Sequence, residues 1–233
     1  MLKSDFHIHT KEDPYDSYIK YSAKDLIKYA VKLGFEVLSI TNHHKIHYNK
    51  GLADYALKKG ILLIPGVETH VDGKEVLLLN VRKPGTLDNF SDLEKLRNEN
   101  AAVIAPHPFY PMPSCLGRKL VKNIQFFDGV EYSHFYLKHF NLFNNKAVKI
   151  ADKYKKTLVG TSDAHRLLQF NFTYSLVDCD KKIDSVLEAI RKGKVQIKTK
   201  KLPFMSFSKV FCSFFLIGTN RRAKNIKFDN YYD

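Results

Sequence analysis

A chain of 233 residues, 44% hydrophobic and 27% charged, can bury a full core as one large domain, alone or with a small appendage. No run reaches the eighteen or so apolar residues of a membrane span, and a strand pattern follows Met1 without a signal peptide. The three cysteines lack the spacing of disulfides or of a metal knuckle. We therefore expect a protein of the reducing cytoplasm. The formal net charge of +14 suits anionic partners such as phosphate esters or nucleic acid, but cations spread along the chain are equally typical of a solvated surface without a partner.

Strand and helix patterns alternate along the chain. Ser22-Ala-Lys-Asp25 is a capping box that opens a helix, and Gly34 follows the end of that helix. Between the helices, short apolar runs are typical of strands that are covered on both faces. We expect helices over residues 22–34, 52–59, from 91, 140–154 and 184–193, and strands over 5–9, 36–41, 61–64, 75–80, 101–105, 127–131, 158–161 and 174–177. This alternation predicts a parallel β/α fold, either closed as a barrel or open.

The first strand carries two histidines at alternate positions, in Asp5-Phe6-His7-Ile8-His9. Alternate side chains of a strand lie on the same face, so His7 and His9 can bind one metal ion together. An isolated pair of this kind is more often two surface histidines without a function. The hypothesis that His7 and His9 bind a metal is supported only by the ligand-type residues that follow the later strands.

Such residues occur at one strand end after another, where β/α barrels carry their chemistry. They are His7, His9, Asp16, His43, His44, Glu68, His107, His134, Asp163 and His165. Each one taken singly has a structural explanation, as a turn residue, a helix start or a cap. Without His44, nine nitrogen and oxygen ligands remain on one rim, and a zinc ion uses only about four. We therefore predict two or three divalent metal ions, of zinc, manganese or iron.

Five motifs in chain order resemble those of the PHP (polymerase and histidinol phosphatase) domain family. They are Asp5-Phe-His-Ile-His-Thr10, Ile40-Thr-Asn-His43, Pro65-Gly-Val-Glu68, Ala105-Pro-His-Pro108 and Gly160-Thr-Ser-Asp-Ala-His165. The resemblance covers residues 1–193. It implies a distorted seven-stranded (β/α) barrel of TIM-like type, with a trinuclear metal site and metal-dependent phosphoesterase activity.

The resemblance also implies three sets of metal ligands. One ion would be held by His7, His9, Glu68 and Asp163. A second would be held by Glu68, His107 and His134, with Glu68 bridging the two ions. A third would be held by Asp16, His43 and His165.

The chain departs from the family pattern in two places. Asn42 stands before His43 where the family usually has Asp, and the loop of residues 10–16 differs from the usual Ser-Asp-Gly turn. Asp13 is therefore an alternative to Asp16 as a ligand. Four further histidines match no motif: His44, His47, His70 and His139.

These motifs predict a hydrolase acting on a phosphomonoester, a nucleotide or a short oligonucleotide, with a hydroxide made available by the metals. The candidate catalytic residues are Glu68, Asp163, His165 and Arg166, with Arg118 and Lys119 as further candidate phosphate clamps. Two alternatives stay open: an amidohydrolase-like enzyme acting on C–N or C–O bonds, and a basic nucleic-acid-binding protein with a weakened metal site. The sequence carries no aromatic-and-basic motif of a known RNA-binding module, which weighs against the second.

Residues 194–233 form a basic and apolar extension that differs from the rest of the chain. Its run Leu202–Ile217 is strongly apolar and is flanked by cations. Such a segment packs on its own barrel or on a second copy of the chain, or else lies on a membrane surface. We expect packing on protein, with a homo-oligomer as one outcome.

Overall fold

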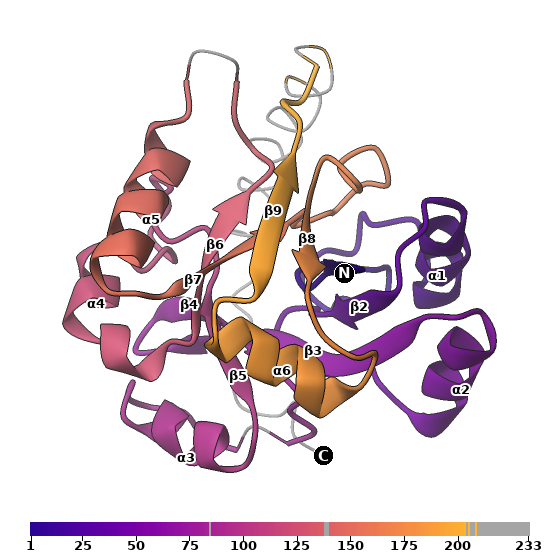
Figure 1. Ribbon diagram of the computed structural model, residues 1–233, viewed down its shortest axis with the longest axis horizontal. Helices are drawn as coiled ribbons and strands as arrows, with labels where there is room; N and C mark the ends of the chain where they lie inside the picture. The colour runs from indigo at the N-terminus through magenta and orange to yellow at the C-terminus, as the bar shows by residue number, and fades with distance from the viewer. Residues whose placement is uncertain (84, 138–139, 204, 206–207, 209–233) are drawn as a thin grey trace.

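In the computed structural model of the protein, the described residues form one sheet of nine strands that curves into a nearly closed barrel (Figure 1). The structure describes residues 1–83, 85–137, 140–203, 205 and 208. The strands lie in the order β7-β6-β5-β4-β3-β2-β1-β8-β9. Their bounds are β1 Leu2–Asp5, β2 Val37–Ile40, β3 Leu62–Val71, β4 Lys74–Leu79, β5 Ala102–Ala105, β6 Gly129–Ser133, β7 Thr157–Thr161, β8 Thr173–Val177 and β9 Val195–Thr199.

Helices cover the outside of the sheet, with α1 and α2 on one side and α3, α4 and α5 on the other (Figure 1). Their bounds are α1 Ala23–Lys32, α2 Lys50–Lys58, α3 Asp92–Asn98, α4 Arg118–Lys122, α5 Leu142–Lys153 and α6 Ile183–Arg191, with a 3-10 turn at Ile124–Phe126. Across the described residues, no helix has both the length and the apolar character needed to cross a membrane.

Local sequence signals explain some helix ends and not others. The capping box at Ser22 is confirmed, because its hydroxyl accepts from the Asp25 N–H and the Asp25 carboxylate accepts from the Ser22 N–H. Ser91 makes no such side-chain bond at the start of α3. The predicted helix over 140–154 begins at Leu142, so Phe140 lies outside α5.

The sheet is mixed, whereas the sequence predicted a parallel sheet and the family resemblance implied seven strands. Strands β1 and β2, β2 and β3, β5 and β6, and β6 and β7 pair in parallel, but β4 runs antiparallel to both of its neighbours. Strand β8 is also antiparallel to β1 and to β9. The reversal of β4 follows a hairpin at Asp72-Gly73, where both residues have positive φ, +50° and +69°. An Asp-Gly pair favours this kind of two-residue turn. The strand predicted over 61–64 is longer than expected and ends at Val71, and the chain then reverses into β4.

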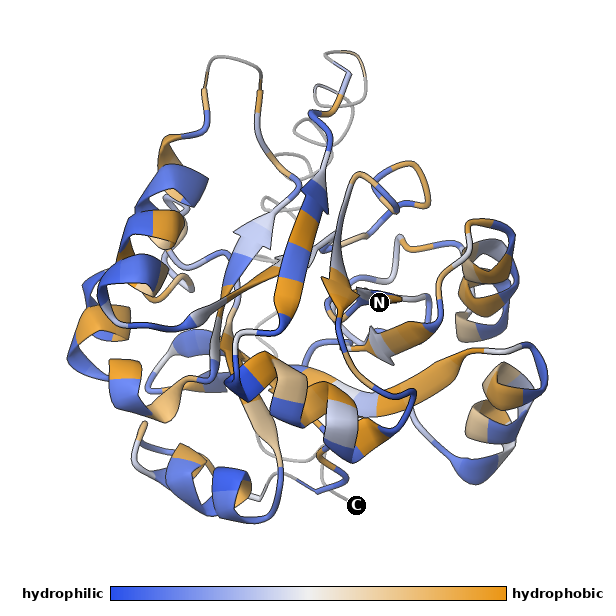
Figure 2. Cartoon of the chain, viewed as in Figure 1, coloured by the Kyte–Doolittle hydropathy of each residue, from blue (hydrophilic) through white to orange (hydrophobic). Residues whose placement is uncertain are grey.

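The barrel is filled by apolar side chains that pack against α6. Phe6, Ile64 and Leu77 belong to one buried cluster with Val186 and Leu187 of α6. Figure 2 shows that β2 and β3 are mainly hydrophobic, while hydrophobic and hydrophilic residues alternate along α6. Helix α6 lies at the end of the barrel where β5 and β7 begin. Two hydrogen bonds hold it there: the Arg191 guanidinium donates to the Ala101 carbonyl oxygen, and the Thr157 hydroxyl donates to the Ile190 carbonyl oxygen. The opposite end, where the parallel strands finish, is left for the ligand-type residues.

At that opposite end the segment after the edge strand β7 contacts the segment after β1, an interior strand of the sheet. Ile8 and Ala164 form a parallel bridge, and the His9 N–H donates to the Ala164 carbonyl oxygen over 3.1 Å. The Tyr21 hydroxyl donates to the same oxygen over 2.6 Å. Further down the barrel, the Ser175 hydroxyl donates to the Gly160 carbonyl oxygen. The segment after β1 is thus held against the segment after β7.

The sheet continues past residue 193, where the sequence placed the start of the extension. Residues 195–199 of that extension form β9, which pairs antiparallel with β8. Most of the apolar run Leu202–Ile217 lies outside the described residues, and so does His139. The packing and oligomer expected of this run therefore remain predictions.

Gly160 provides a test of how tightly the barrel closes. A Cβ at this position would lie 2.8 Å from the Tyr174 carbonyl oxygen and 2.8 Å from Ile197 Cγ2, so β7 could not approach β8 and β9 as closely. We expect Gly160→Ala to lower the free energy of unfolding, measured in urea, by about 1–3 kcal/mol. Gly51→Ala is the matched control, because its Cβ would meet one atom at 3.4 Å in an exposed part of α2. We expect that change to be neutral or stabilising, and equal losses in the two variants would contradict this picture of closure.

Candidate metal centre

Four histidines from three segments surround the carboxylate of Glu68, which is buried in β3. Glu68 Oε2 lies 3.2 Å from His7 Nε2 and 3.3 Å from the Nε2 atoms of His9 and His43. Glu68 Oε1 lies 3.2 Å from His107 Nε2. The sheet produces this convergence, because these histidines follow β1, β2 and β5, whose ends lie at one rim. Glu68 therefore occupies the middle of the cluster, with one oxygen toward each side.

Asp163 joins the cluster from the segment after β7. Its Oδ1 lies 3.4 Å from the Nε2 atoms of both His7 and His9. The backbone bridge between Ile8 and Ala164 accounts for this proximity, since it aligns the two segments residue by residue. Glu68 Oε1 and Asp163 Oδ1 are both buried without a hydrogen-bond partner among the described residues. Buried carboxylate oxygens in this state are costly unless a cation compensates them.

The spacing of these atoms fits a metal ion. His7 Nε2 and His9 Nε2 are 3.1 Å apart, although two neutral imidazoles have no reason to turn unprotonated nitrogens toward each other. Ligands about 2.1 Å from a tetrahedral ion are separated by roughly 3.4 Å, and octahedral ligands by roughly 3.0 Å. His7, His9 and Asp163 form one group of mutually close ligand atoms, and His7, Glu68 and His107 form another. The residues present therefore fit divalent cations.

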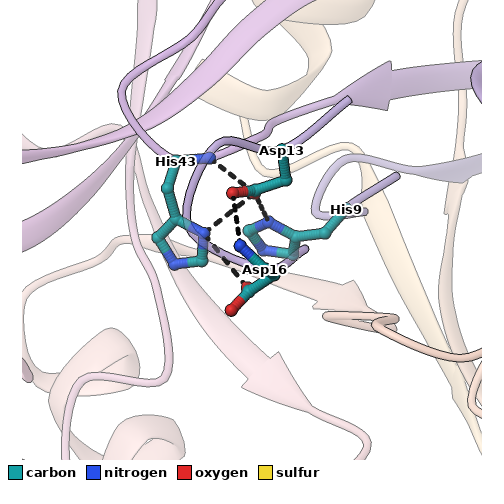
Figure 3. A group of neighbouring side chains, drawn as sticks. All are labelled: His9, Asp13, Asp16 and His43. Carbon is teal, nitrogen blue, oxygen red and sulfur yellow. Dashed lines mark hydrogen bonds and ion pairs between the residues drawn. The ribbon is translucent and has the colours of Figure 1, made fainter. Parts of the chain in front are cut away.

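A neighbouring group contains both candidates from the loop after His9, namely Asp13 and Asp16 (Figure 3). Asp13 Oδ2 lies 2.9 Å from the Nδ1 atoms of both His9 and His43. It also accepts the His43 N–H, while Asp13 Oδ1 accepts the N–H of Tyr15 and of Asp16. The carboxylate of Asp13 is thus already engaged by its own chain, in a way that orients two imidazoles.

Asp16 contacts the two residues with which the sequence grouped it. Its Oδ2 lies 3.0 Å from His165 Nε2 and 3.4 Å from His43 Nδ1. His165 Nδ1 lies 3.0 Å from the Asp163 carbonyl oxygen, to which it can donate a proton. That bond selects the tautomer of His165 whose Nε2 is unprotonated and directed at Asp16.

His134 lies apart from these close groups. It is buried, its Nδ1 has no hydrogen-bond partner among the described residues, and its Nε2 lies 3.1 Å from Gln169 Nε2. Burial lowers the pKa of His134 to about 4, which keeps the ring neutral, as a metal ligand must be. Glu68, His107 and His134, the predicted ligands of the second ion, all line one cavity. His134 does not contact Glu68 directly.

The structure adds a carboxylate that the sequence analysis did not single out. Glu131 lies in β6 and is fully buried; its Oε1 is 3.2 Å from His7 Nδ1 and also accepts the Thr161 hydroxyl. Its Oε2 accepts the His107 N–H. Glu131 therefore orients two predicted ligands at once. The available signal was a charged residue inside an otherwise buried strand.

Asp5 supports the same region from the end of β1. Its Oδ1 accepts the N–H groups of His7 and Ser162, which links the segments after β1 and β7. Burial raises the pKa of the Asp5 carboxyl to about 7.

The predicted cationic clamps do not join the centre. Arg166 is exposed and does not line the cavity, and its N–H donates to the Gln169 side chain. Arg118 is exposed, and Lys119 pairs with Asp72. No Lys or Arg is present among the described residues that line the cavity. His44 and His70 bind each other through His44 Nε2 and His70 Nδ1, 2.8 Å apart.

Charge in the centre is balanced by the histidines when no metal is bound. Burial opposes the protonated form of His7, but the carboxylates of Glu68, Asp163 and Glu131 outweigh it and raise its pKa to about 10. Burial likewise opposes the ionised form of Glu68, but His7, His43 and His107 together hold its pKa well below the usual range. The centre is thus built to hold anionic carboxylates beside cations.

A family model and a curated relative match parts of the chain. The family described as PHP-associated matches residues 141–195. An uncharacterized protein of Methanocaldococcus jannaschii is 32% identical over 130 residues, covering 51% of this chain and 75% of that protein.

Several solved structures share the fold. PsfC of Pseudomonas syringae has a TM-score of 0.60 at 15% identity, covering 94% of this chain and 98% of that one. A candidate metal-dependent phosphoesterase of Bifidobacterium adolescentis has a TM-score of 0.54 at 13% identity, covering 70% and 87%. A lesion-specific endonuclease of Pyrococcus furiosus has a TM-score of 0.57 at 16% identity, covering 84% of this chain and 57% of that one.

The raised pKa of His7 predicts how stability depends on pH when metal is removed. The folded pKa is about 10 against an ordinary 6.5, so the stabilisation is complete below pH 6.5 and is lost as the pH rises toward 10. We expect the free energy of unfolding of chelator-treated protein, measured in urea, to fall by on the order of 1–3 kcal/mol between about pH 6.5 and 9.

Two comparisons check the cause of that pH dependence. His7→Asn removes the titrating group, so the chelated variant should show a flatter profile over this pH range. Metal-loaded protein should show the opposite slope, because metal binding needs deprotonated imidazoles and strengthens as the pH rises. A flat profile for the chelated unmutated protein would contradict the assignment.

Proposed function

The chain belongs to the PHP-domain family, and on this premise we propose that it is a metal-dependent hydrolase of phosphate esters. The observation that carries the proposal is the position of Glu68. Its two oxygens lie between the imidazoles of His7, His9 and His43 on one side and that of His107 on the other. A carboxylate so placed suits a bridge between two cations, and paired metal sites are typical of enzymes that transfer phosphoryl groups.

We propose the following ligands for three ions. The first ion is held by His7, His9, Glu68 and Asp163, which the short distances between their ligand atoms support. The second is held by Glu68, His107 and His134, supported by the one cavity that all three residues line. The third is held by Asp16, His43 and His165, supported by the 3.0 Å distance between Asp16 Oδ2 and His165 Nε2. Imidazole and carboxylate ligands suit zinc, manganese or iron.

When bound, such ions lower the pKa of water and neutralise charge on a phosphoryl group. The residues of the chain prepare for that chemistry by fixing the ligands. Glu131 holds Nδ1 of His7, and Asp13 holds Nδ1 of His9 and of His43, so that in each ring Nε2 faces the centre. Burial of all three rings keeps bulk water from competing for these positions. Mutation of such supporting partners typically costs 10- to 100-fold in metal affinity or activity.

The cavity of about 600 Å³ beside the centre has the size of a small-molecule site. We propose a phosphomonoester, a nucleotide or a short oligonucleotide as the substrate. The fold shared with a candidate phosphoesterase and with an endonuclease supports this range of phosphate esters. A nucleic-acid-binding protein acting through its +14 charge would place cations at its site, and none lines this cavity among the described residues.

Variants at two carboxylates test the proposed bridge. Glu68→Gln weakens two ions, whereas Asp16→Asn weakens one, so we expect Glu68→Gln to lose more phosphate release, by about 100-fold or more. The measurement is phosphate release from a panel of phosphomonoesters and nucleotides with added Mn²⁺ or Zn²⁺, alongside elemental analysis. Glu188→Gln, at an exposed carboxylate paired with Lys192, is the control and should leave the rate unchanged.

Other outcomes would redirect the assignment. Equal losses in Glu68→Gln and Asp16→Asn would remove Glu68 from the bridging role. A larger loss in Asp13→Asn than in Asp16→Asn would exchange those two residues. A metal-loaded protein that releases no phosphate but cleaves amide bonds would favour the amidohydrolase-like alternative. Nucleic-acid affinity that survives in Asp163→Asn and falls steeply with salt would favour the binding alternative.

A further inference from the structure

The cavity beside the metal centre is lined by two chemically different sets of residues. One set holds the predicted ligands and the polar residues Glu75, Ser114, Ser133 and Asn141, and the other is Tyr110, Pro111, Met112, Phe135, Tyr136, Phe140 and Phe143. We propose that this aromatic wall, defined by those seven residues, binds the alcohol part of the substrate, and that this part is an aromatic or apolar ring rather than a polyhydroxylated chain. The proposal rests on the proposed function and names the substrate class for the same site.

The rings form a continuous series that starts at a predicted ligand. Ring centroids are separated by 6.0 Å between His134 and Phe135, 6.5 Å between Phe135 and Tyr110, and 4.8 Å between Tyr110 and Phe143. Phe140 ends the series, 5.8 Å from Phe143. These separations fall within the range at which aromatic rings attract one another, and the same faces can receive a further ring. A phosphoryl group at the ligands would therefore place its alcohol part along the wall.

Polar groups of the wall are already committed to the protein. The Tyr110 hydroxyl donates to the Phe135 carbonyl oxygen over 2.6 Å, and the Tyr136 hydroxyl pairs with that of Thr199 over 2.9 Å. The Asn141 amide donates to the Tyr132 hydroxyl. A sugar or glycerol moiety placed against the wall would lose water and gain few hydrogen bonds from these residues, whereas an apolar ring would bury its surface there at no such cost.

Charge along the wall points to the same class of substrate. No Lys or Arg lines the cavity among the described residues, so a second phosphate or carboxylate on the substrate would find no cation there. Phe140 and Met112 are nonetheless 49% and 45% exposed, a large apolar surface for residues beside a polar centre. A ring bound against them would remove that surface from water.

Two phosphate monoesters of primary alcohols separate ring binding from leaving-group chemistry, namely benzyl phosphate and glycerol 1-phosphate. We expect a lower KM for benzyl phosphate at similar kcat. Phe140→Ala should raise the KM for benzyl phosphate roughly three- to tenfold, the loss expected for one aromatic contact, and should leave the KM for glycerol 1-phosphate unchanged. Leu142→Ala removes a nearby side chain, 62% exposed, that does not line the cavity, and it should change neither KM.

Binding of benzylphosphonate to metal-loaded protein, measured by calorimetry, provides a readout that does not need turnover. Weaker binding in Phe140→Ala but not in Leu142→Ala supports the aromatic wall even if neither ester is hydrolysed, in which case only the proposed function fails. Equal KM values for the two esters overturn the inference while hydrolysis stands. An equal effect of Phe140→Ala on both esters, or unchanged phosphonate binding, overturns it as well.

Discussion

The backbone bridge between Ile8 and Ala164 is the contact on which the metal centre depends. The His9 N–H bonded to the Ala164 carbonyl oxygen joins the segment after β1 to the segment after β7, which lies across the barrel opening in the sheet order. Without that closure, Asp163 would not lie beside His7 and His9. Asp5 reinforces the junction by accepting the N–H groups of His7 and Ser162. The relative positions of the ligands therefore depend more on the contact between the segments after β1 and β7 than on the conformation of any single loop.

Electrostatic compensation explains why so many charged groups can be buried at that closure. Glu68, Glu131 and Asp13 are carboxylates with little or no exposure, and an isolated buried charge is costly. Here each lies within hydrogen-bond distance of one or more imidazoles, which carry protons when metal is absent and would face cations when it is present. Proton and metal thus compete for one set of nitrogens. The same arrangement that stabilises the metal-free fold prepares the site for ions.

Local sequence patterns predicted the parts of the site that depend on local geometry. The spacing of His7 and His9 places both nitrogens at the same point, and the capping box at Ser22 forms as expected. Other features depend on contacts that no local pattern contains. Asp13 lies in a loop for which the sequence predicted no conformation, and it contacts the His9 ring and accepts the His43 N–H. Glu131 contacts the His7 ring from the middle of β6.

Proximity in sequence also misled the prediction in one place. Arg166 directly follows His165, but the chain turns after Asp163, whose φ is +44°, and Arg166 is left at the surface. The sequence predicted eight strands and the described residues contain nine, because β9 lies after residue 193, where no strand was expected. The aromatic wall was equally invisible to residue spacing, since its members come from the segments after β5 and β6 and from the start of α5.

The bridge at Ala164 has a consequence for the folding of the chain during its synthesis. Asp5 and Ser162, which flank the junction, are 157 residues apart in the chain. His7 and His9 are therefore synthesised long before Asp163, one of their carboxylate partners. Contacts of such long range form late in folding, because the entropy of closing the loop must be overcome first. A nascent chain that lacks Asp163 and His165 therefore presents only part of the proposed ligand set.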